Sequence, residues 1–324
     1  MHRYKRKRKK GNIRLVIAIL IVVVIIVGGV VYFASKNKTV QAKENSSTVS
    51  KTTEQSINSS NNKEDSSKNT NTDVAKNKFG YPENGDNIIA SAKSYAVPAN
   101  QVFDMIETKN KVNNEKEVFL TFDDGPSENT PQILNILNKY GVHATFFAMG
   151  NNLNSEANRG YLKEAYNDGN AIGNHTYSHN FKKLYPGNNV NVDVFMKEIA
   201  QTDDMMRNIL GSNFNTRVIR MPGGYMSRAY YHDKNLNALN EAFKETGIVS
   251  IDWDAETGDA TGNNLPVNKL VSTAIKESTN ENHVILLMHD AAAKKTTVEA
   301  LPQVIQWYKD HGYSFKVIEN SPMQ

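Results

Sequence analysis

The sequence predicts an α/β domain of parallel strands and intervening helices, preceded by a membrane anchor and a disordered linker. Three observations support this prediction: short apolar runs alternate with helical patterns from residue 117 onward, residues 15–34 are apolar and uncharged, and residues 35–78 are almost entirely polar. A length of 324 residues allows one large domain or two small ones. The chain has no cysteine, so disulfides, thiolate metal sites and cysteine nucleophiles are excluded. Any metal site must therefore use histidines and carboxylates.

Residues 15–34 read LVIAILIVVVIIVGGVVYFA. A helix of this length spans roughly 30 Å, the thickness of a bilayer core. A buried core helix is disfavoured because the run is apolar on every face. A cleaved signal peptide is disfavoured because its apolar part is usually ~7–15 residues long and a cleavage site follows closely. Residues 1–14 hold eight Lys and Arg, so we expect an uncleaved single-pass anchor in the cell membrane, with the N-terminus in the cytoplasm and residues 35–324 outside.

The net charge of +4 comes from this basic tail, because the rest of the chain holds 30 basic and 34 acidic residues. The charge therefore gives no support for a nucleic-acid partner. Residues 35–78 lack aromatic residues and cannot bury enough apolar surface to offset chain entropy, so we predict a disordered linker. Residues 79–116 regain aromatic residues and are predicted to be an approach segment to a folded domain at residues 117–320.

The folded domain alternates strand and helix patterns. The predicted strands are residues 118–122, 144–149, 171–172, 217–221, 248–253, 284–288 and 313–318. The predicted helices are residues 131–140, 161–167, 192–210, 236–245, 270–276 and 298–309. Thr130 and Pro131 suit the N-cap and first positions of the first helix, and Gly141 and Gly247 suit helix ends. This alternation is typical of parallel βαβ units, and it leaves open one barrel or one doubly wound sheet.

Polar clusters follow five of these strands. They read TFDDGP at residues 121–126, HTYSH at 175–179, RMPGG at 220–224, WDAETGD at 253–259 and LMH at 287–289. Each cluster alone is compatible with a turn or a solvated loop. His175 and His179 are four residues apart, so one helical turn would place both imidazoles on one face. Parallel α/β sheets bind ligands at the carboxyl ends of their strands, where all five clusters fall, so the sequence predicts a metal-dependent active site there.

In these five motifs, taken in order, the sequence resembles the polysaccharide deacetylases of carbohydrate esterase family 4, the NodB-homology domain. The resemblance covers roughly residues 117–320. With its N-terminal anchor and polar linker, the chain is most similar to membrane-anchored peptidoglycan N-acetylglucosamine deacetylases of Gram-positive bacteria. The resemblance implies a distorted (β/α) barrel, which agrees with the alternation of strands and helices.

The resemblance also implies a metal site and two proton-transfer groups. Asp124, His175 and His179 form a ligand set of two histidines and one carboxylate. Such a set suits zinc and is also compatible with cobalt or another first-row divalent metal. Asp123 is expected to be the general base that takes a proton from water. His289 is expected to be the general acid that protonates the departing amine.

Further roles follow from the same resemblance. Arg220 is expected to orient Asp123 by a charge-assisted hydrogen bond. Asp259 is expected to raise the pKa of His289. The backbone N–H of Gly223 is expected to stabilise an oxyanion, and Leu287 to line a small acetyl pocket.

The chain departs from the family pattern at two places. Many members have an aromatic residue after the proline of the third motif, where this chain has Gly223 and Gly224. Many have Trp after the last Asp of the fourth motif, where this chain has Ala260. We therefore expect Tyr225 or Trp253 to build the apolar wall of the substrate pocket.

The function that the resemblance implies is hydrolysis of the N-acetyl group of N-acetylglucosamine in cell-wall glycan. The alternatives are deacetylation of N-acetylmuramic acid or of another exported polysaccharide, and O-acetyl ester hydrolysis. An ester has less need of a general acid, so the presence of His289 and Asp259 favours an amide. A wall-binding module with an inactive site is disfavoured because all five motifs keep their chemical groups.

Overall fold

The computed structural model describes residues 78–79, 81, 84–108 and 115–322. The chain divides into two compact units, Met1–Thr72 and Asp73–Gln324, and every described residue belongs to the second. The predicted anchor at residues 15–34 and nearly all of the predicted linker lie outside the described residues, so both stay predictions. Within the described part of the chain, no helix is long and apolar enough to cross a bilayer.

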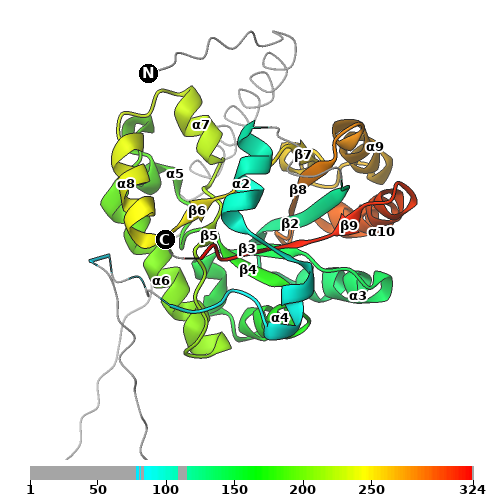
Figure 1. Cartoon of the computed structure of the whole chain (residues 1–324), viewed down its shortest axis with the longest axis horizontal. Helices are drawn as coiled ribbons and strands as arrows, with labels where there is room; N and C mark the ends of the chain where they lie inside the picture. The colour runs from blue at the N-terminus through cyan, green and yellow to red at the C-terminus, as the bar shows by residue number, and fades with distance from the viewer. Residues whose placement is uncertain (1–77, 80, 82–83, 109–114, 323–324) are drawn as a thin grey trace, which may run out of the picture. The chain divides into compact units, whose positions relative to one another are not determined.

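A parallel sheet forms the centre of the second unit (Figure 1). Its strands lie in the order β6 (Val249–Ser250), β5 (Val218–Ile219), β4 (Ala171–Asn174), β3 (Thr145–Ala148), β2 (Glu117–Gly125), β8 (His283–His289) and β7 (Ala255–Glu256). Every neighbouring pair is parallel, and β9 (Ser314–Phe315) pairs with the start of β2. Among the described strands no ladder joins β6 to β7, so the sheet is a curled half-barrel. The parallel α/β class is confirmed.

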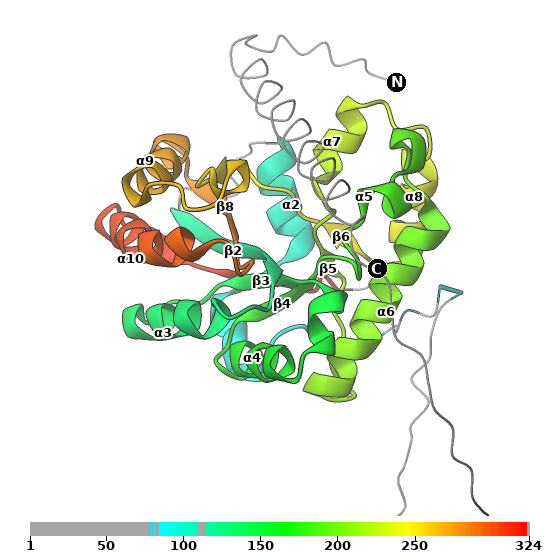
Figure 2. The ribbon, with the colours of Figure 1, turned by 180° about the vertical axis from the view of Figure 1, so that it is seen from behind.

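Helices connect the strands and cover the outer face of the sheet (Figures 1 and 2). The longer ones are α3 (Thr130–Tyr140), α4 (Glu156–Asn167), α6 (Val192–Leu210), α8 (Leu236–Thr246), α9 (Val267–Ser278) and α10 (Lys295–Asp310). Short elements lie after the strand ends: η2 (Gly150–Asn154), α5 (Phe181–Leu184), η3 (Pro186–Asn188), α7 (Tyr225–Tyr230) and η4 (Asp259–Thr261). Gly141 and Gly247 adopt left-handed conformations at the ends of α3 and α8, as the sequence predicts.

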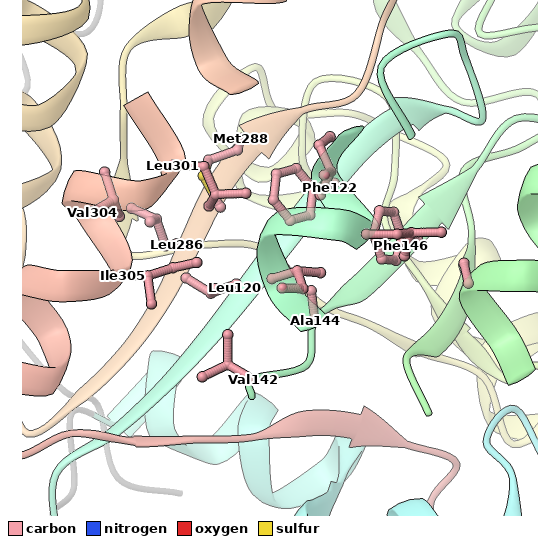
Figure 3. Packing of buried hydrophobic residues seen from close by; sticks show 14 of the residues in the cluster. Leu120, Phe122, Val142, Ala144, Phe146, Leu286, Met288, Leu301, Val304 and Ile305 are labelled. Atoms are coloured by element: carbon pink, nitrogen blue, oxygen red, sulfur yellow. The ribbon is translucent and has the colours of Figure 1, made fainter. Parts of the chain in front are cut away.

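Residues of the central strands alternate between two apolar layers, as the period of two in a strand requires. In β2 the outer layer receives Val118, Leu120 and Phe122. Figure 3 shows this layer, where side chains of β2, β3 and β8 meet those of α10. The inner layer receives Phe119 of β2 and Ile285 of β8. By the same period, Thr121 and Asp123 lie on the inner side of β2 after Phe119. Leu287 and His289 likewise lie on the inner side of β8 after Ile285. The inner side of the sheet therefore becomes polar toward the carboxyl ends of these strands.

A segment before the predicted domain completes the inner layer. η1 (Ala90–Tyr95), β1 (Ala96–Pro98) and α2 (Ala99–Thr108) are folded, and β1 pairs in parallel with β10 (Val317–Glu319). Val102 and Met105 of α2 pack with Phe119 and Ile285. Part of the approach segment at residues 79–116 is therefore integral to the fold, a role that its sequence pattern does not indicate.

Several predicted bounds differ from the structure, and two of these differences are informative. Helix α3 begins at Thr130 with Asn129 at the N-cap, one residue earlier than expected. The reason is that the Thr130 hydroxyl donates to the buried carboxylate of Asp290 at 2.6 Å. The predicted strand at residues 313–318 is two short strands, β9 and β10, which pair with β2 and β1 respectively.

The close packing inside the half-barrel predicts opposite effects for two glycine substitutions. A Cβ at Gly173 of β4 would lie 2.5 Å from the ring of Phe147, whereas a Cβ at Gly160 of α4 would meet nothing within 4 Å. Gly173→Ala should lower the free energy of unfolding by about 1–3 kcal/mol through overpacking. Gly160→Ala should raise it by roughly 0.5–1 kcal/mol through helix propensity. Urea unfolding of both variants measures these changes, and equal effects at the two positions would contradict the packing described.

Candidate functional site

The predicted site residues converge at the carboxyl ends of the strands. They are Asp123 and Asp124 at the end of β2, His175 and His179 after β4, Arg220 after β5, Asp259 in η4 and His289 at the end of β8. Asp123 and His289 are partners in the ladder between β2 and β8. The structure therefore places side chains from five segments at one edge of the sheet.

A bulge in β2 lets two consecutive carboxylates serve one site. Neighbouring strand residues normally point to opposite faces. In the β2–β3 ladder Asp123 pairs with Phe147 and Gly125 with Ala148, so Asp124 is an extra residue. Its φ of 68° lies in the left-handed region, which Asp tolerates better than most residues. Such a bulge redirects side chains at a strand end, so Asp124 is re-aimed toward the histidines while Asp123 stays on the inner face.

Asp124, His175 and His179 present one ligand atom each within 4.8 Å of one another, and in the described part of the chain this is the one group of that kind. Oδ1 of Asp124 is buried without a hydrogen-bond partner, 3.5 Å from Nε2 of His175 and 3.6 Å from Nε2 of His179. These separations are too long for hydrogen bonds. They resemble those between ligands of a tetrahedral zinc ion, which lie about 3.3 Å apart when each is ~2.0–2.1 Å from the metal. The residues present therefore fit a divalent cation.

The charges within this group favour its metal-binding forms. Burial raises the pKa of Asp124, but the positive charges of His175 and His179 outweigh burial and leave that pKa below its ordinary value. Burial, and then the charge of His175, lower the pKa of His179. Both shifts favour the deprotonated side chain, which is the form that binds a metal.

A loop, and not the predicted helical turn, brings the two histidines together. Residues 175–180 form no helix, and Thr176 and His179 have φ values of 65° and 50°. These left-handed residues turn the chain so that the two imidazole rings approach to 5.0 Å between centroids. Nδ1 of His175 donates to the backbone carbonyl of Arg220 at 2.7 Å, since a carbonyl can only accept. Nε2 of His175 is therefore left to face Asp124.

Glu198 of α6 holds this loop, and the sequence analysis missed it. Its buried carboxylate accepts hydrogen bonds from the backbone N–H of Ser178 at 2.9 Å and from the Ser178 hydroxyl at 2.7 Å. Ser178 directly precedes His179, so these bonds fix the backbone that carries the imidazole. The available signal was an acidic residue on the apolar face of α6, between Phe195 and Thr202.

Arg220 is fully buried and connects Asp123, the expected general base, to the sheet. Its Nη1 donates to Oδ1 of Asp123 at 2.9 Å and to the hydroxyl of Thr121 at 2.7 Å. Its Nε and Nη2 donate to the backbone carbonyls of residues 251–252. The guanidinium also lies 4.3 Å from the ring centroid of Phe147. The expected hydrogen bond between Arg220 and Asp123 is present, and its part in catalysis stays a prediction.

His289 and Asp259 form a second, separate pair. Nδ1 of His289 lies 2.8 Å from Oδ1 of Asp259, whose other oxygen accepts from the Thr297 hydroxyl at 2.8 Å. Burial alone would lower the pKa of His289, but the charge and hydrogen bond of Asp259 outweigh burial and raise it to about 9. Burial raises and His289 lowers the pKa of Asp259, with a net shift below the ordinary value. At neutral pH the pair is therefore an imidazolium beside a carboxylate.

The four residues predicted to contact substrate lie in different settings. Leu287 is buried on the inner side of β8, and Trp253 lies close to the buried guanidinium. Gly223 is exposed, with a left-handed φ of 77°. The hydroxyl of Tyr225 donates to Asn240 of α8 at 3.0 Å, so this side chain is engaged with that helix.

A cleft of about 690 Å³ opens beside the metal-ligand group. It is lined by Asp124, Pro126, Ser127, Glu128, Met149, Asn152, Ala157, Asn158, Tyr161, Ser178, His179, Ala291 and Ala292. The lining mixes apolar surfaces with amide and hydroxyl groups, which suits a ligand that carries both.

Removing the support of the histidine loop should weaken metal binding. Glu198→Ala takes away the acceptor for Ser178, so zinc affinity should fall roughly 10–100-fold, the usual cost of losing such a partner. Zinc titration of the purified apoprotein measures this, with His179→Ala as the variant that removes a ligand outright. Glu198→Gln keeps an acceptor oxygen and should retain most of the affinity. Wild-type zinc affinity in Glu198→Ala would contradict the positioning role.

Comparison with known proteins identifies relatives of this chain. Residues 110–242 match the family model for polysaccharide deacetylase. A putative polysaccharide deacetylase of Bacillus subtilis, YheN, is 31% identical over 222 residues, which cover 67% of this chain and 71% of that protein. A peptidoglycan-N-acetylglucosamine deacetylase of Bacillus cereus is 32% identical over 205 residues, which cover 62% of this chain and 66% of that protein.

This chain is also similar to a solved structure. The CE4 esterase of Streptococcus mutans superimposes with a TM-score of 0.64 and 36% sequence identity. The similarity covers 72% of this chain and 95% of that one, so nearly the whole of that structure has a counterpart here.

Proposed function

The chain belongs to the polysaccharide deacetylase family, whose members are metal-dependent hydrolytic deacetylases. We propose that it removes the N-acetyl group of N-acetylglucosamine residues in cell-wall peptidoglycan and releases acetate. The observation that carries the proposal is a protonated His289 held by Asp259, next to a separate carboxylate, Asp123. Amide hydrolysis uses both, because the attacking water loses a proton and the departing amine gains one. The Bacillus cereus relative is named for this activity.

Asp124, His175 and His179 would hold the divalent cation, and their donor atoms suit zinc. When bound, such an ion supplies Lewis-acid chemistry, because it makes water more acidic and polarises a carbonyl group.

The side chains around this group divide the proton transfers. Asp123 accepts the proton of the attacking water, while Arg220 holds its other carboxylate oxygen. His289 donates a proton from Nε2 to the amine nitrogen, because its Nδ1 is engaged by Asp259. A base and an acid on separate groups allow both transfers without a proton passing between them.

The acetyl group is proposed to lie against Leu287, with the backbone N–H of Gly223 donating to the oxygen of the tetrahedral intermediate. Of the two residues expected to form the apolar wall of the pocket, we favour Trp253, because the hydroxyl of Tyr225 is hydrogen-bonded to α8. Hydrolysis of an O-acetyl ester is the alternative, and the Streptococcus mutans relative is named an esterase. An alkoxide leaves more readily than an amine, so the imidazolium of His289 favours the amide.

Mass spectrometry of muropeptides from cells with and without the protein tests the proposed substrate. We expect muropeptides lighter by one acetyl group, with the loss on glucosamine, only where the protein is present. An acetyl loss confined to muramic acid, or no difference, would refute the proposal.

The two proton-transfer groups should respond differently to the leaving group. Asp123→Asn should lower kcat/KM by roughly 10²–10⁴-fold on both an N-acetyl substrate and an aryl acetate ester, because both need an activated water. His289→Ala should cause a comparable loss on the amide only, because a phenolate leaves without a proton. Both variants should retain zinc. Equal damage to ester and amide in His289→Ala would exclude His289 as the leaving-group acid.

Asp259→Asn should move the alkaline limit of kcat to lower pH. In the wild type the charge of Asp259 raises the pKa of His289 to about 9, so the acid stays protonated up to that pH and activity falls above it. Without this charge burial lowers the pKa, and we expect a shift of roughly one unit or more. The pH profile of kcat, together with an NMR titration of the His289 ring, measures the shift. Coincident profiles for the two proteins would show that Asp259 does not set this pKa.

We also propose that residues 15–34 anchor the chain and that the domain acts outside the cell membrane, from the basic residues that precede the apolar run. Protease added to intact, wall-stripped cells should release a fragment that begins within residues 35–80. A chain that stays intact until the cells are lysed would contradict export.

A further inference from the structure

Exposed apolar side chains gather on one side of the candidate site. Four of the five large ones among the described residues lie on α5, on α7 or directly after α7. They are Phe181 (45% exposed), Met226 (40%), Tyr230 (50%) and Tyr231 (41%). The fifth, Phe103 (37%), lies on α2. Clustered exposed apolar side chains commonly mark a binding surface, and α5 and α7 lie on the same side of the domain (Figures 1 and 2).

This surface begins at the site itself. The ring of Phe181 meets the ring of His179 edge to face, with centroids 5.5 Å apart. A Cβ at Gly223 would lie only 3.1 Å from the Phe181 ring, so that ring lies directly over the Gly223 backbone. Phe181 therefore borders both a proposed metal ligand and the proposed oxyanion donor.

Ring contacts continue from Phe181 to the end of α7. Phe181 packs against Tyr185 at 5.5 Å, and the guanidinium of Arg228 lies 4.3 Å from Tyr185 and 5.4 Å from Tyr231. Tyr231 in turn packs against Tyr230 at 5.3 Å. Arg228 is itself buried and donates to the side chain of a residue in η3 at 3.0 Å. The exposed rings are thus held in place before any ligand binds, which lowers the entropy cost of binding.

The chemistry of this surface fits an extended glycan strand. The C–H faces of sugar rings are apolar and flat, so they suit exposed aromatic rings, whose fixed geometry adds little ordering cost. A polymer that reacts at an internal unit must leave the site in two directions. The cleft beside Asp124 and Tyr161 provides one exit, and the surface that starts at Phe181 lies beyond the residues that line this cleft.

We propose that Phe181, Tyr230 and Tyr231 form a stacking platform for the part of the glycan strand beyond the sugar that is deacetylated. This inference rests on the proposed function and deepens it, because it assigns a preference for long substrates to particular rings. Phe181 contacts the unit next to the reacting one, whereas Tyr230 and Tyr231 contact units further along the strand.

The experiment compares a disaccharide and a hexasaccharide of N-acetylglucosamine as substrates of the full chain, purified in detergent. In the double variant Tyr230→Ala/Tyr231→Ala, kcat/KM for the hexasaccharide should fall roughly tenfold, the factor that corresponds to 1.4 kcal/mol, mainly through KM. Activity on the disaccharide should stay at the wild-type level. Tyr230→Phe/Tyr231→Phe keeps both rings and should retain the preference for the longer substrate. Phe103→Ala, which removes an exposed ring outside the platform, should change neither activity.

Calorimetric titration with the hexasaccharide provides a readout that is independent of turnover. Weaker binding by the double alanine variant supports the platform. Equal binding by the variant and the wild type, or no binding by the wild type, overturns it. A change in molar mass by light scattering in the alanine variant would make this face an interface between copies of the chain and would also overturn the proposal. Binding of the hexasaccharide by the wild type, together with muropeptides that do not differ between cells with and without the protein, would refute the proposed function while leaving the platform in place.

Discussion

The guanidinium of Arg220 is the buried charge on which the site depends. It lies inside the half-barrel without exposure to solvent and is compensated by Asp123, the Thr121 hydroxyl and two backbone carbonyls. The backbone carbonyl of the same residue fixes the tautomer of His175. One residue therefore positions the proposed base through its side chain and a proposed metal ligand through its main chain. Breaking such a buried pair typically costs about 3–5 kcal/mol, and Lys cannot replace the planar fork of donors.

The ends of the central strands could be predicted from the sequence because each signal lies within a few consecutive residues. Apolar runs followed by polar motifs identified β2, β4 and β8 and the residues that follow them. The strands predicted at residues 217–221 and 248–253 correspond to β5 and β6, which have only two residues each. The edge strand β7 was not predicted, because its two residues are too few for a period to appear. The inner layer was also beyond prediction, because α2 fills it with residues that pack against strands distant in the sequence.

Within the site, residue types were predictable and backbone conformations were not. Spacing suggested a helical turn for His175 and His179, but left-handed residues produce the same convergence in a loop. The bulge at Asp124 depends on pairing with β3, which no local pattern shows. Glu198 is distant in sequence from the loop that it holds, so only the fold reveals their contact.

Gly223 and Gly224 leave space that aromatic rings of other segments fill. The absence of a side chain at Gly223 leaves room for the ring of Phe181, the first residue of α5. A Cβ at Gly224 would lie 3.1 Å from the Trp253 ring. Aromatic surface at this edge is thus provided by residues outside the third motif.

The ladder between β2 and β8 has a consequence for motion. Asp123 and His289 are partners in adjacent strands, which lie about 4.8 Å apart. The backbone N–H of Asp290, the residue after His289, donates to the backbone carbonyl of Asp123 at 2.8 Å. The two groups cannot move apart unless the last bonds of this ladder break, and bonds between core strands open less readily than exposed short helices. The backbone of the reacting groups should therefore be more rigid than α5 and α7. Adjustment to substrates of different shape is then expected in α5 and α7 at the rim of the site, while the distance between the two proton-transfer groups stays fixed.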